Sequence, residues 1–349
     1  MRVVVVGASG NVGTSLIQSL AREKEITSVV GLARRLPEWR AAKTEWQAAD
    51  IAYDDMAAHF QGADAVVHLA WLFQPTHSPL ITWRNNVLGS LRVFRAAAEA
   101  RVPSLVYASS VAAYSPGPER QPVDESWPTH GWPMAAYSRE KAYVERALDA
   151  IEHEFPDQRV VRLRSGFIFK QASATAQRRL FAGPFLPGRL VRPGLVPVLP
   201  RLPGLRFQAL HSLDAGEACR QALVRPVRGA FNIAADPVLD VERLAPLLRA
   251  RTAPVPAGPL RAALAAAWHL HLAPASPYLL DAVLQLPIMD TTRAREELGF
   301  SPVHSGVEAV EEFLQGLRTG TGMSTPPLDP QAGGRMRERE ITTGVGERP

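Results

Sequence analysis

A tyrosine and a lysine lie four positions apart in the segment AAYSREKAYVER, residues 135–146. On a helix, positions i and i+4 share a face, so the ammonium group of Lys141 would lie beside the phenol of Tyr137. A nearby positive charge favours the phenolate and lowers its pKa from about 10 toward the range in which the tyrosine can exchange protons. The pair therefore predicts an acid/base group for a hydride-coupled reaction. The alternative is a pair of neighbours on the solvent-facing side of a helix.

A hydroxyl partner for this pair comes from the strand-like segment VYASSVAAY, residues 106–114. The segment ends the strand that precedes the predicted helix of Tyr137, and it contains Ser109 and Ser110. A serine at that position can hold the oxygen atom of a substrate while the tyrosine exchanges its proton. We therefore predict that Ser110, Tyr137 and Lys141 are the catalytic residues.

A glycine-rich motif, GASGNVG, connects the valine-rich N-terminal strand to a predicted helix at residues 7–13. Glycine is needed where the backbone turns sharply and where it approaches a pyrophosphate, while the helix N-terminus offers free N–H groups to the phosphates. The motif predicts a dinucleotide site in this strand-turn-helix context. The predicted contacts in the turn are Gly7, Ser9, Gly10, Asn11, Val12 and Gly13.

The end of the second predicted strand, VVGLARR, lacks the acidic residue that NAD-selective sites usually place on the ribose hydroxyls. Arg34 and Arg35 stand there instead, and arginine can pair with a 2′-phosphate in a bidentate way. We therefore expect NADP to be preferred and NAD to be the alternative; a solvated basic turn is the competing interpretation. Asp50 and Ile51, after a third short strand, are predicted at the adenine edge, although Asp50 is equally suited to cap a helix.

Composition limits the classes of function. The chain has 349 residues, 46% of them hydrophobic, and a net charge of only +5 that comes from scattered arginines, unlike a nucleic-acid-binding arm. Its single cysteine, Cys219, is expected to be a small buried side chain, so no disulfide framework is predicted, which suits a reducing cytoplasm. The apolar segment 260–274 is too short to span a membrane. We expect a cytoplasmic protein that acts on a small molecule, without nucleic-acid, membrane or metal partners.

Valine-rich segments without polar alternation alternate with helical patterns through the first half of the chain. Such strands are covered on both faces, which predicts an α/β fold with a doubly wound parallel sheet of the Rossmann type. Residues 183–205 contain six prolines and four glycines and are predicted to be a loop or lid. The predicted organisation is a dinucleotide-binding core (1–165), a smaller C-terminal substrate lobe with segments that return to the core sheet (166–318), and a disordered tail (319–349).

From residue 1 to about 318, the chain resembles the extended short-chain dehydrogenase/reductases, the NAD-dependent epimerase/dehydratase family. The resemblance rests on GASGNVG, VVHLA (66–70), Asn86 in NNVLGS, Ser110 before VAAY, the pair Tyr137 and Lys141, LHSLD (210–214) and DTTRAREELGFSP (290–302). It implies an NAD(P)-binding domain, a smaller substrate lobe and frequently a homodimer. It also implies that Lys141 holds the nicotinamide ribose, and that Leu69, Ala70 and Asn86 lie at the cofactor.

Departures from the family pattern narrow the expected chemistry. Ser110 is followed by Val111 rather than the Asp-Glu pair of 4,6-dehydratases, so a dehydratase is not expected. Nucleotide-sugar epimerases place a diphosphate-binding arginine four residues before the histidine of LHSLD; that position is Phe207, and Arg206 beside it would point to the opposite face of a strand. Apolar residues of the Pro-rich segment are suited to line an apolar pocket or to pack a surface loop: Phe185, Leu186, Leu190, Val191, Leu195 and Val196.

The sequence therefore predicts an NAD(P)-dependent oxidoreductase that transfers hydride at a secondary alcohol or ketone of a small, rather apolar substrate. The alternatives are a nucleotide-sugar epimerase that retains NAD and a non-enzymatic NADP-binding sensor or scaffold.

Several further residues receive mainly structural predictions. His68 is expected to pack beneath the cofactor rather than bind a metal. Asp124 and Glu125 are predicted to form a turn or cap a helix. Trp127 and Trp132 are predicted to line the pocket or to pack the loop. His211 and Asp214 are predicted to lie where the C-terminal lobe returns to the sheet.

Overall fold

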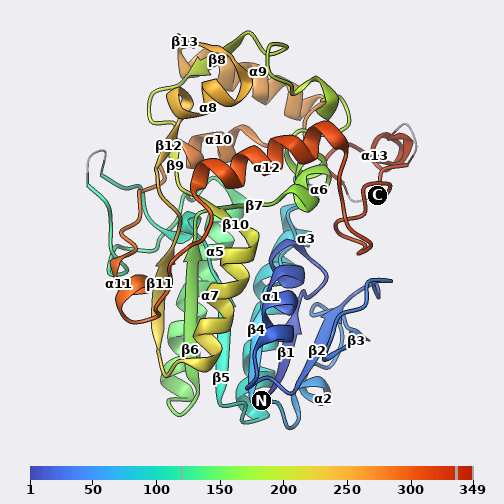
Figure 1. Cartoon of the computed structure of the whole chain (residues 1–349), viewed down its shortest axis with the longest axis vertical. Coiled ribbons are helices and arrows are strands. Elements are labelled where there is room, and N and C mark those ends of the chain that lie inside the picture. Colours follow the sequence, from blue (N-terminus) through green and yellow to red (C-terminus); the bar gives the residue numbers. More distant parts are fainter. Residues whose placement is uncertain (119–120, 335–336, 348–349) are drawn as a thin grey trace.

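The computed structural model describes residues 1–118, 121–334 and 337–347. Within these residues, seven parallel strands form one twisted sheet in the order β11-β6-β5-β4-β1-β2-β3 (Figure 1). Their bounds are β1 (Arg2–Val6), β2 (Ser28–Ala33), β3 (Thr44–Ala48), β4 (Ala65–His68), β5 (Ser104–Ala108), β6 (Arg159–Ser165) and β11 (Gly229–Ile233). This topology confirms the predicted doubly wound sheet of the Rossmann type.

Helices cover both faces of the sheet, which explains the uninterrupted valines of β1. Val3 and Val5 pack on the side of α1 (Asn11–Arg22) and α7 (Ser212–Val224), whereas Val4 and Val6 pack on the side of α4 (Gly89–Glu99) and α5 (Ala136–Glu154). Successive side chains of a strand point to opposite faces, so a strand buried on both sides needs an apolar residue at every position.

A second lobe lies above the carboxyl ends of the strands (Figure 1). Its small strands pair two by two, β7 with β10, β9 with β12 and β8 with β13. The strands and helices of the lobe are β7 (Phe167–Phe169), β8 (Val198–Arg201), β9 (Arg206–Phe207), β10 (Ala209–His211), β12 (Leu239–Asp240), β13 (Arg251–Pro254), α6 (Ala174–Phe181), α8 (Val241–Leu248), α9 (Ala257–His269), α10 (Pro277–Val283) and α12 (Gly306–Thr319).

Short elements complete the chain. They are α2 (Ala57–Phe60), α3 (Pro79–Trp83), the π-helix η1 (Arg84–Leu88), the 3₁₀ turns η2 (Val111–Ala113), η3 (Gln171–Ser173) and η4 (Gly188–Leu190), α11 (Thr292–Glu296) and α13 (Glu338–Thr342). The chain leaves the sheet after β6, and α7 and β11 return to it, so the lobe is built from separate segments.

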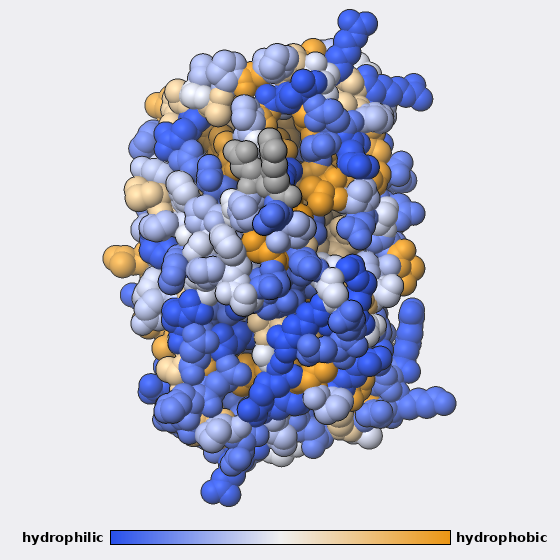
Figure 2. Space-filling model, turned by 90° about the vertical axis from the view of Figure 1, so that its left-hand side faces the viewer, coloured by the Kyte–Doolittle hydropathy of each residue, from blue (hydrophilic) through white to orange (hydrophobic). Residues whose placement is uncertain are grey.

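The Pro-rich segment 183–205 contains only η4 and β8 as regular structure. Phe185, Leu186, Leu190 and Leu195 are exposed, so these four side chains do not line an enclosed apolar pocket. Figure 2 shows that apolar surface gathers around a hollow in the upper half of one face, while the lower half is largely hydrophilic.

The C-terminal segment differs from the disordered tail expected from its composition. Glu340 on α13 pairs with Arg178 on α6 at 2.6 Å, and both side chains are buried. Arg179 donates to the carbonyl oxygens of Pro327 and Asp329. Two neighbouring arginines of α6 thus hold the described part of the tail, a tertiary interaction that the composition of the tail does not reveal. Residues 335–336 and 348–349 of the predicted tail lie outside the described ranges.

None of the helices that the structure describes combines the length and apolar character needed to cross a membrane.

Candidate active site

The glycine-rich turn between β1 and α1 leaves no room for side chains at two of its positions. Gly7 has φ +85°, and a Cβ atom there would lie 2.6 Å from the backbone nitrogen of Ala70. A Cβ atom on Gly13 would lie 2.5 Å from the carbonyl oxygen of Ala8. These approaches keep the turn tight and set α1 close against it.

The same turn has the features of a phosphate-binding site. Gly10 precedes α1 and supplies no side-chain cap, and the first turn of the helix carries no acidic residue. Its N–H groups therefore remain available for an anion. The backbone after β4 closes one side, because Leu69 donates to the carbonyl oxygen of Val6 at 2.9 Å and Ala70 packs on Gly7. The predicted residues of the turn, with Leu69 and Ala70, thus come together and fit a dinucleotide.

The residues predicted around the adenosine follow β2 and β3, the two strands that come after β1 in the sheet. Arg34 and Arg35 directly follow β2 and are exposed. The carboxylate of Asp50 accepts the N–H of Ala52 at 2.9 Å, so its side chain caps a turn. Ile51 is half-buried and packs against Gly89 at the start of α4. Their contacts with a cofactor remain predictions.

The two serines after β5 face different partners. Ser109 donates to Glu145 at 2.5 Å within the protein interior. Ser110 accepts the N–H of Ala112 at 3.2 Å and lies near enough to Tyr137 to act on the pKa of its phenol. Successive residues of an extended segment point in opposite directions, which separates the two hydroxyls. The structure therefore brings Ser110, and not Ser109, to the tyrosine.

Tyr137 lies in an apolar environment at the start of α5. Its ring stacks on Phe73 with the centroids 5.2 Å apart and meets Trp71 edge-on at 5.8 Å. Burial raises the pKa of Tyr137 to about 12, although Ser110 acts to lower it. The prediction that the phenol has a lowered pKa is therefore wrong for this structure, because desolvation, together with the carboxylate of Glu140, outweighs the effect of Ser110.

The ammonium group of Lys141 points to other groups. It donates to the carbonyl oxygen of Ala108 at 2.7 Å and to the hydroxyl of Tyr107 at 3.2 Å. It also lies 3.6 Å from the centre of the Trp71 ring, a cation–π contact. Burial lowers the pKa of Lys141 to about 7, with the carboxylates of Glu145 and Glu140 acting in the opposite direction.

Asn86, predicted at the cofactor, uses its side chain inside the protein. Its amide oxygen accepts the N–H of Leu72 at 2.7 Å, and its amide nitrogen donates to the carbonyl oxygen of Leu72 at 2.8 Å. The same nitrogen donates to Glu140 at 2.7 Å. The side chain thus fixes the loop after β4, and a contact between Asn86 and the cofactor remains only a prediction.

A buried ionic network beneath α5 was not anticipated from the sequence. Glu145 accepts from Arg162 at 3.1 Å and from Arg164 at 3.0 Å. Burial alone would raise the pKa of Glu145, but the two guanidinium groups and Ser109 hold it at about 2. The signal in the sequence is the segment RVVRLRS, where two arginines with a spacing of two interrupt an otherwise apolar strand.

Lys170 is a second residue that the sequence analysis missed. Its ammonium group donates to the carbonyl oxygen of Asn11 at 2.8 Å, to Thr14 at 2.7 Å and to Ser15 at 3.0 Å. Burial lowers its pKa to about 7. The lysine thus ties the segment after β7 to the first turn of α1, next to the glycine-rich turn.

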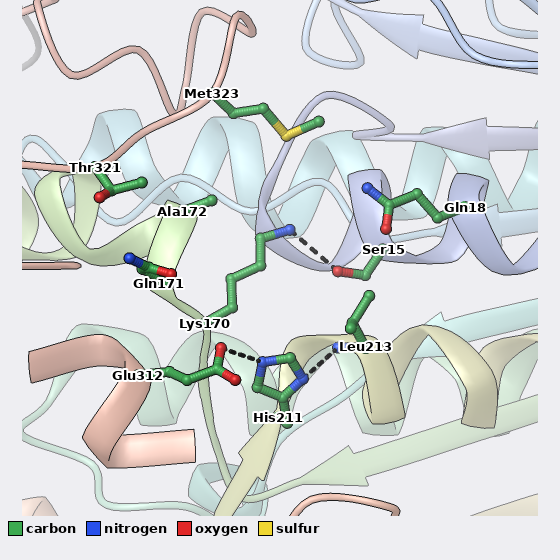
Figure 3. Close-up of a pocket in the computed structure, with 10 residues that line it drawn as sticks. All are labelled: Ser15, Gln18, Lys170, Gln171, Ala172, His211, Leu213, Glu312, Thr321 and Met323. Atoms are coloured by element: carbon green, nitrogen blue, oxygen red, sulfur yellow. Dashed lines mark hydrogen bonds and ion pairs between the residues drawn. The ribbon is translucent and has the colours of Figure 1, made fainter. Parts of the chain in front are cut away.

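A cavity of about 240 Å³ opens beside Lys170 (Figure 3). His211 and Glu312 lie next to each other in its lining, with 3.1 Å between Nε2 and the carboxylate. Together with His304 these groups lie within 4.8 Å, close enough to suggest a metal site. However, Nδ1 of His211 accepts the N–H of Leu213, so Nε2 must carry the proton that it shares with Glu312 and has no lone pair for a metal.

Two other predicted residues lie in the core. His68 is buried, pairs with Ser90 at 2.8 Å, and has a pKa lowered to about 3 by burial, so it is neutral. Cys219 is buried on α7 and burial raises its pKa to about 12, which confirms the prediction of a small, unreactive side chain.

The remaining candidates hold loops together. Asp124 accepts from the N–H and the hydroxyl of Ser126, as in a turn, and Glu125 accepts the N–H of Asn232 at 2.8 Å. The indole of Trp127 donates to Ser115, so this tryptophan packs the loop, whereas the half-buried Trp132 has a buried indole nitrogen without a partner among the described residues. Asp214 on α7 accepts the N–H groups of Val303 and His304, and thereby ties the C-terminal part of the lobe to the core.

Residues 3–169 match the NAD dependent epimerase/dehydratase family. This match covers the glycine-rich turn, Ser110, Tyr137 and Lys141. The dinucleotide-binding part of the chain therefore resembles this family, and the comparisons support an NAD(P)-dependent enzyme.

Individual relatives are distant. An uncharacterized protein of Mycobacterium tuberculosis is 27% identical over 355 residues, which span 94% of this chain and 86% of that protein. A 4-hydroxy-2-methyl-3-oxo-4-farnesyl-3,4-dihydroquinoline-1-oxide ketoreductase of Stigmatella aurantiaca is 28% identical over 48% of this chain and 51% of its own. The UDP-glucose 4-epimerase of Thermus thermophilus, solved with NAD, is 19% identical, with a TM-score of 0.68 over 91% of this chain and 99% of that chain, and shares the fold.

Proposed function

We propose that this protein is an NAD(P)-dependent oxidoreductase that transfers hydride at a secondary alcohol or ketone of a small, rather apolar substrate. The observation that carries the proposal is the convergence of the acid/base pair on the end of β5: Lys141 donates to the carbonyl oxygen of Ala108 at 2.7 Å, and Trp71 contacts both Lys141 and Tyr137. Ser110, two residues after β5, acts to lower the pKa of Tyr137. This is the arrangement of an alcohol-oxidising acid/base site.

Each residue has a defined role in the proposal. The bound dinucleotide supplies the hydride to the carbonyl carbon in reduction, or accepts it in oxidation. Tyr137 gives the carbonyl oxygen its proton in reduction and removes it in oxidation, while Ser110 holds that oxygen. Lys141 lies on the same helix and replenishes the proton of the phenol. In the structure without ligand the pKa of Tyr137 is near 12, so its protonated form, the proton donor, prevails.

An aromatic residue of the lobe, at the position where epimerases are expected to have an arginine, supports an apolar substrate. Phe207, at the position where epimerases of the family are expected to have an arginine, packs edge-on against Phe167 with the centroids 5.1 Å apart. Arg206 donates to the carbonyl oxygen of Pro118 and does not replace that arginine. A nucleoside diphosphate would therefore meet aromatic rings where it needs cations. The ketoreductase relative, whose substrate name includes a farnesyl group, is in keeping with this class.

We also propose that NADP is the preferred cofactor. The support is the exposed Arg34 directly after β2, a position where an acidic residue would select NAD. The family itself establishes binding of NAD as the general case.

The competing function is nucleotide-sugar epimerisation with retained NAD, which the fold shared with UDP-glucose 4-epimerase makes the natural alternative. Experiments on the purified protein distinguish the reductase from the epimerase. A reductase exchanges its cofactor in each turnover, reduces apolar ketones with NADPH or NADH, and shows no calorimetric binding of UDP- or dTDP-hexoses. Micromolar binding of a nucleotide-sugar, with NAD retained through purification, would replace the proposal by the epimerase.

A non-enzymatic sensor is disfavoured by the complete set of Ser110, Tyr137 and Lys141. Binding of dinucleotide without turnover of any ketone, alcohol or nucleotide-sugar would support it.

A further inference from the structure

The side chain of Asn86 fixes the loop after β4 through two hydrogen bonds to the backbone of Leu72. Asn86 accepts the N–H of Leu72 and donates to its carbonyl oxygen, and all of these groups are buried. Glu140 secures the amide of Asn86 and is itself bonded to Thr82 at 2.6 Å. Because the backbone of Leu72 is held in place, the backbone positions of its neighbours Trp71 and Phe73 are held as well.

These two neighbours, Trp71 and Phe73, both reach the acid/base residues. Trp71 covers the ammonium group of Lys141 and meets Tyr137 edge-on. Phe73 stacks on Tyr137 with an angle of only 13° between the ring planes. Phe181 on α6 extends this surface, with its ring 5.6 Å from that of Phe73 and 38% of the residue exposed. We call Trp71, Phe73 and Phe181 the aromatic wall.

The indole N–H of Trp71 is buried and has no hydrogen-bond partner in the part of the chain that the structure describes. A buried donor without an acceptor is unfavourable, so such groups usually have a partner when the protein is at work. Trp46 and Trp132 carry similar N–H groups, but neither is seen against Lys141 or Tyr137. Among these three tryptophans, Trp71 therefore has the indole N–H group that is best placed to bind a substrate at Tyr137 and Lys141.

Resting on the function proposed above, we propose that the aromatic wall selects planar cyclic ketones, aromatic or conjugated, and that the Trp71 indole donates a hydrogen bond to an oxygen atom of the substrate. Flat rings gain from stacking and edge contacts with aromatic side chains. The hydroxyls of a hexose would lose their hydrogen bonds to water against these rings and find few replacements. Trp71 is thus a specificity-determining residue for the reaction of Tyr137.

The test compares two ketones of similar hydrophobicity, the bicyclic aromatic 1-tetralone and the linear 2-decanone. With the wild-type protein, kcat/KM should favour the aromatic ketone. Trp71→Leu should lower kcat/KM for 2-decanone by about 5- to 10-fold, because the hydrogen bond is lost. It should lower kcat/KM for 1-tetralone by about 10- to 100-fold, because this ketone also loses the aromatic contact.

Trp71→Phe separates the ring from its N–H group. It keeps an aromatic face, so the preference for the aromatic ketone should persist, while KM rises by about 5- to 10-fold for the loss of one hydrogen bond. Trp39→Leu is the matched control, because this tryptophan pairs with Trp46 and is not part of the aromatic wall. It should leave both activities and their ratio unchanged.

Dinucleotide binding and thermal unfolding, measured on each variant, verify that the fold is retained. If Trp71→Leu lowers the activity toward both ketones equally, or if the wild type reduces both without preference, the aromatic wall has no selective role and the inference is overturned while the proposed function stands. If the wild type binds dinucleotide but reduces neither ketone, the proposed function fails and the inference fails with it.

Discussion

Glu145 and Arg164 form an ion pair in the interior of the protein, with 3.0 Å between Oε2 and Nη2. Glu145 belongs to α5, the helix that carries Tyr137 and Lys141, and Arg164 belongs to β6. Arg164 also donates to the hydroxyl of Tyr114 at 2.9 Å, which in turn donates to Asn232 on β11. The pair therefore fixes the helix of the candidate catalytic residues on two neighbouring strands of the sheet.

Replacing this carboxylate should destabilise the fold. Glu145→Gln leaves the buried guanidinium groups of Arg162 and Arg164 without their main counter-charge, and breaking a buried ion pair on one side costs about 3 to 5 kcal/mol. Urea unfolding at pH 7 measures the loss. Glu154→Gln, an exposed position near the end of the same helix, is the control and should change the free energy of unfolding by less than about 0.5 kcal/mol.

The stabilisation by Glu145 should depend on pH in a defined direction. Its pKa is lowered from 4.5 to about 2 in the folded protein, so the stabilisation is fully present above pH 4.5 and is lost as the pH falls toward 2. The difference between the wild type and Glu145→Gln should shrink across this interval. A difference that stays constant down to the acid unfolding transition would contradict the assigned pKa.

Lys141 should reduce the stability of the protein without cofactor. Burial lowers its pKa from 10.5 to about 7, so charging the amine opposes folding below pH 7, and this penalty disappears as the pH rises to 10.5. Lys141→Met should therefore raise the free energy of unfolding on the order of 3 kcal/mol at pH 6.5, and much less near pH 10. Chemical unfolding at both pH values measures the effect, with the exposed Lys24→Met as control. An equal gain at both values would show that packing, and not charge, is responsible.

Tyr137 should be required for chemistry and not for folding. Tyr137→Phe removes the hydroxyl proposed to transfer the proton and should lower kcat by about 10² to 10⁴ while dinucleotide affinity stays the same. Tyr143→Phe, an exposed tyrosine on the same helix, should keep wild-type turnover. Nearly full activity of Tyr137→Phe would assign the proton transfer to another group.

The choice of cofactor should depend on the end of β2. A charge-assisted contact between Arg34 and a 2′-phosphate contributes about 1.5 to 3 kcal/mol, or roughly ten- to a hundred-fold in affinity. Arg34→Ala should therefore weaken NADP binding by this factor and leave NAD binding nearly unchanged, as measured by calorimetry with both dinucleotides. The exposed Arg40→Ala is the control. A wild-type protein that prefers NAD would show that Arg34 and Arg35 form only a solvated turn.

The sequence determined the architecture of the core and the main chemical groups of the site. Four buried valines in β1 and the glycines at residues 7, 10 and 13 are local patterns, because burial on both faces and a tight turn restrict the residue types at each position. The spacing of Tyr137 and Lys141 has the same property, since helical periodicity places both on one face. Cys219 could be assigned to the core for the same reason, from its place in an apolar helix.

The tertiary structure alone decided how these groups are surrounded. The pKa of Tyr137 is raised because Trp71 and Phe73, more than sixty positions earlier in the chain, desolvate the phenol, and no local pattern shows that contact. The choice between Ser109 and Ser110 depends on Glu145, and the docking of the tail depends on Arg178. Desolvation and buried ion pairing arise from the three-dimensional neighbourhood of a group, so residue types and spacing determine which groups are available, and only the fold determines their charge and their partners.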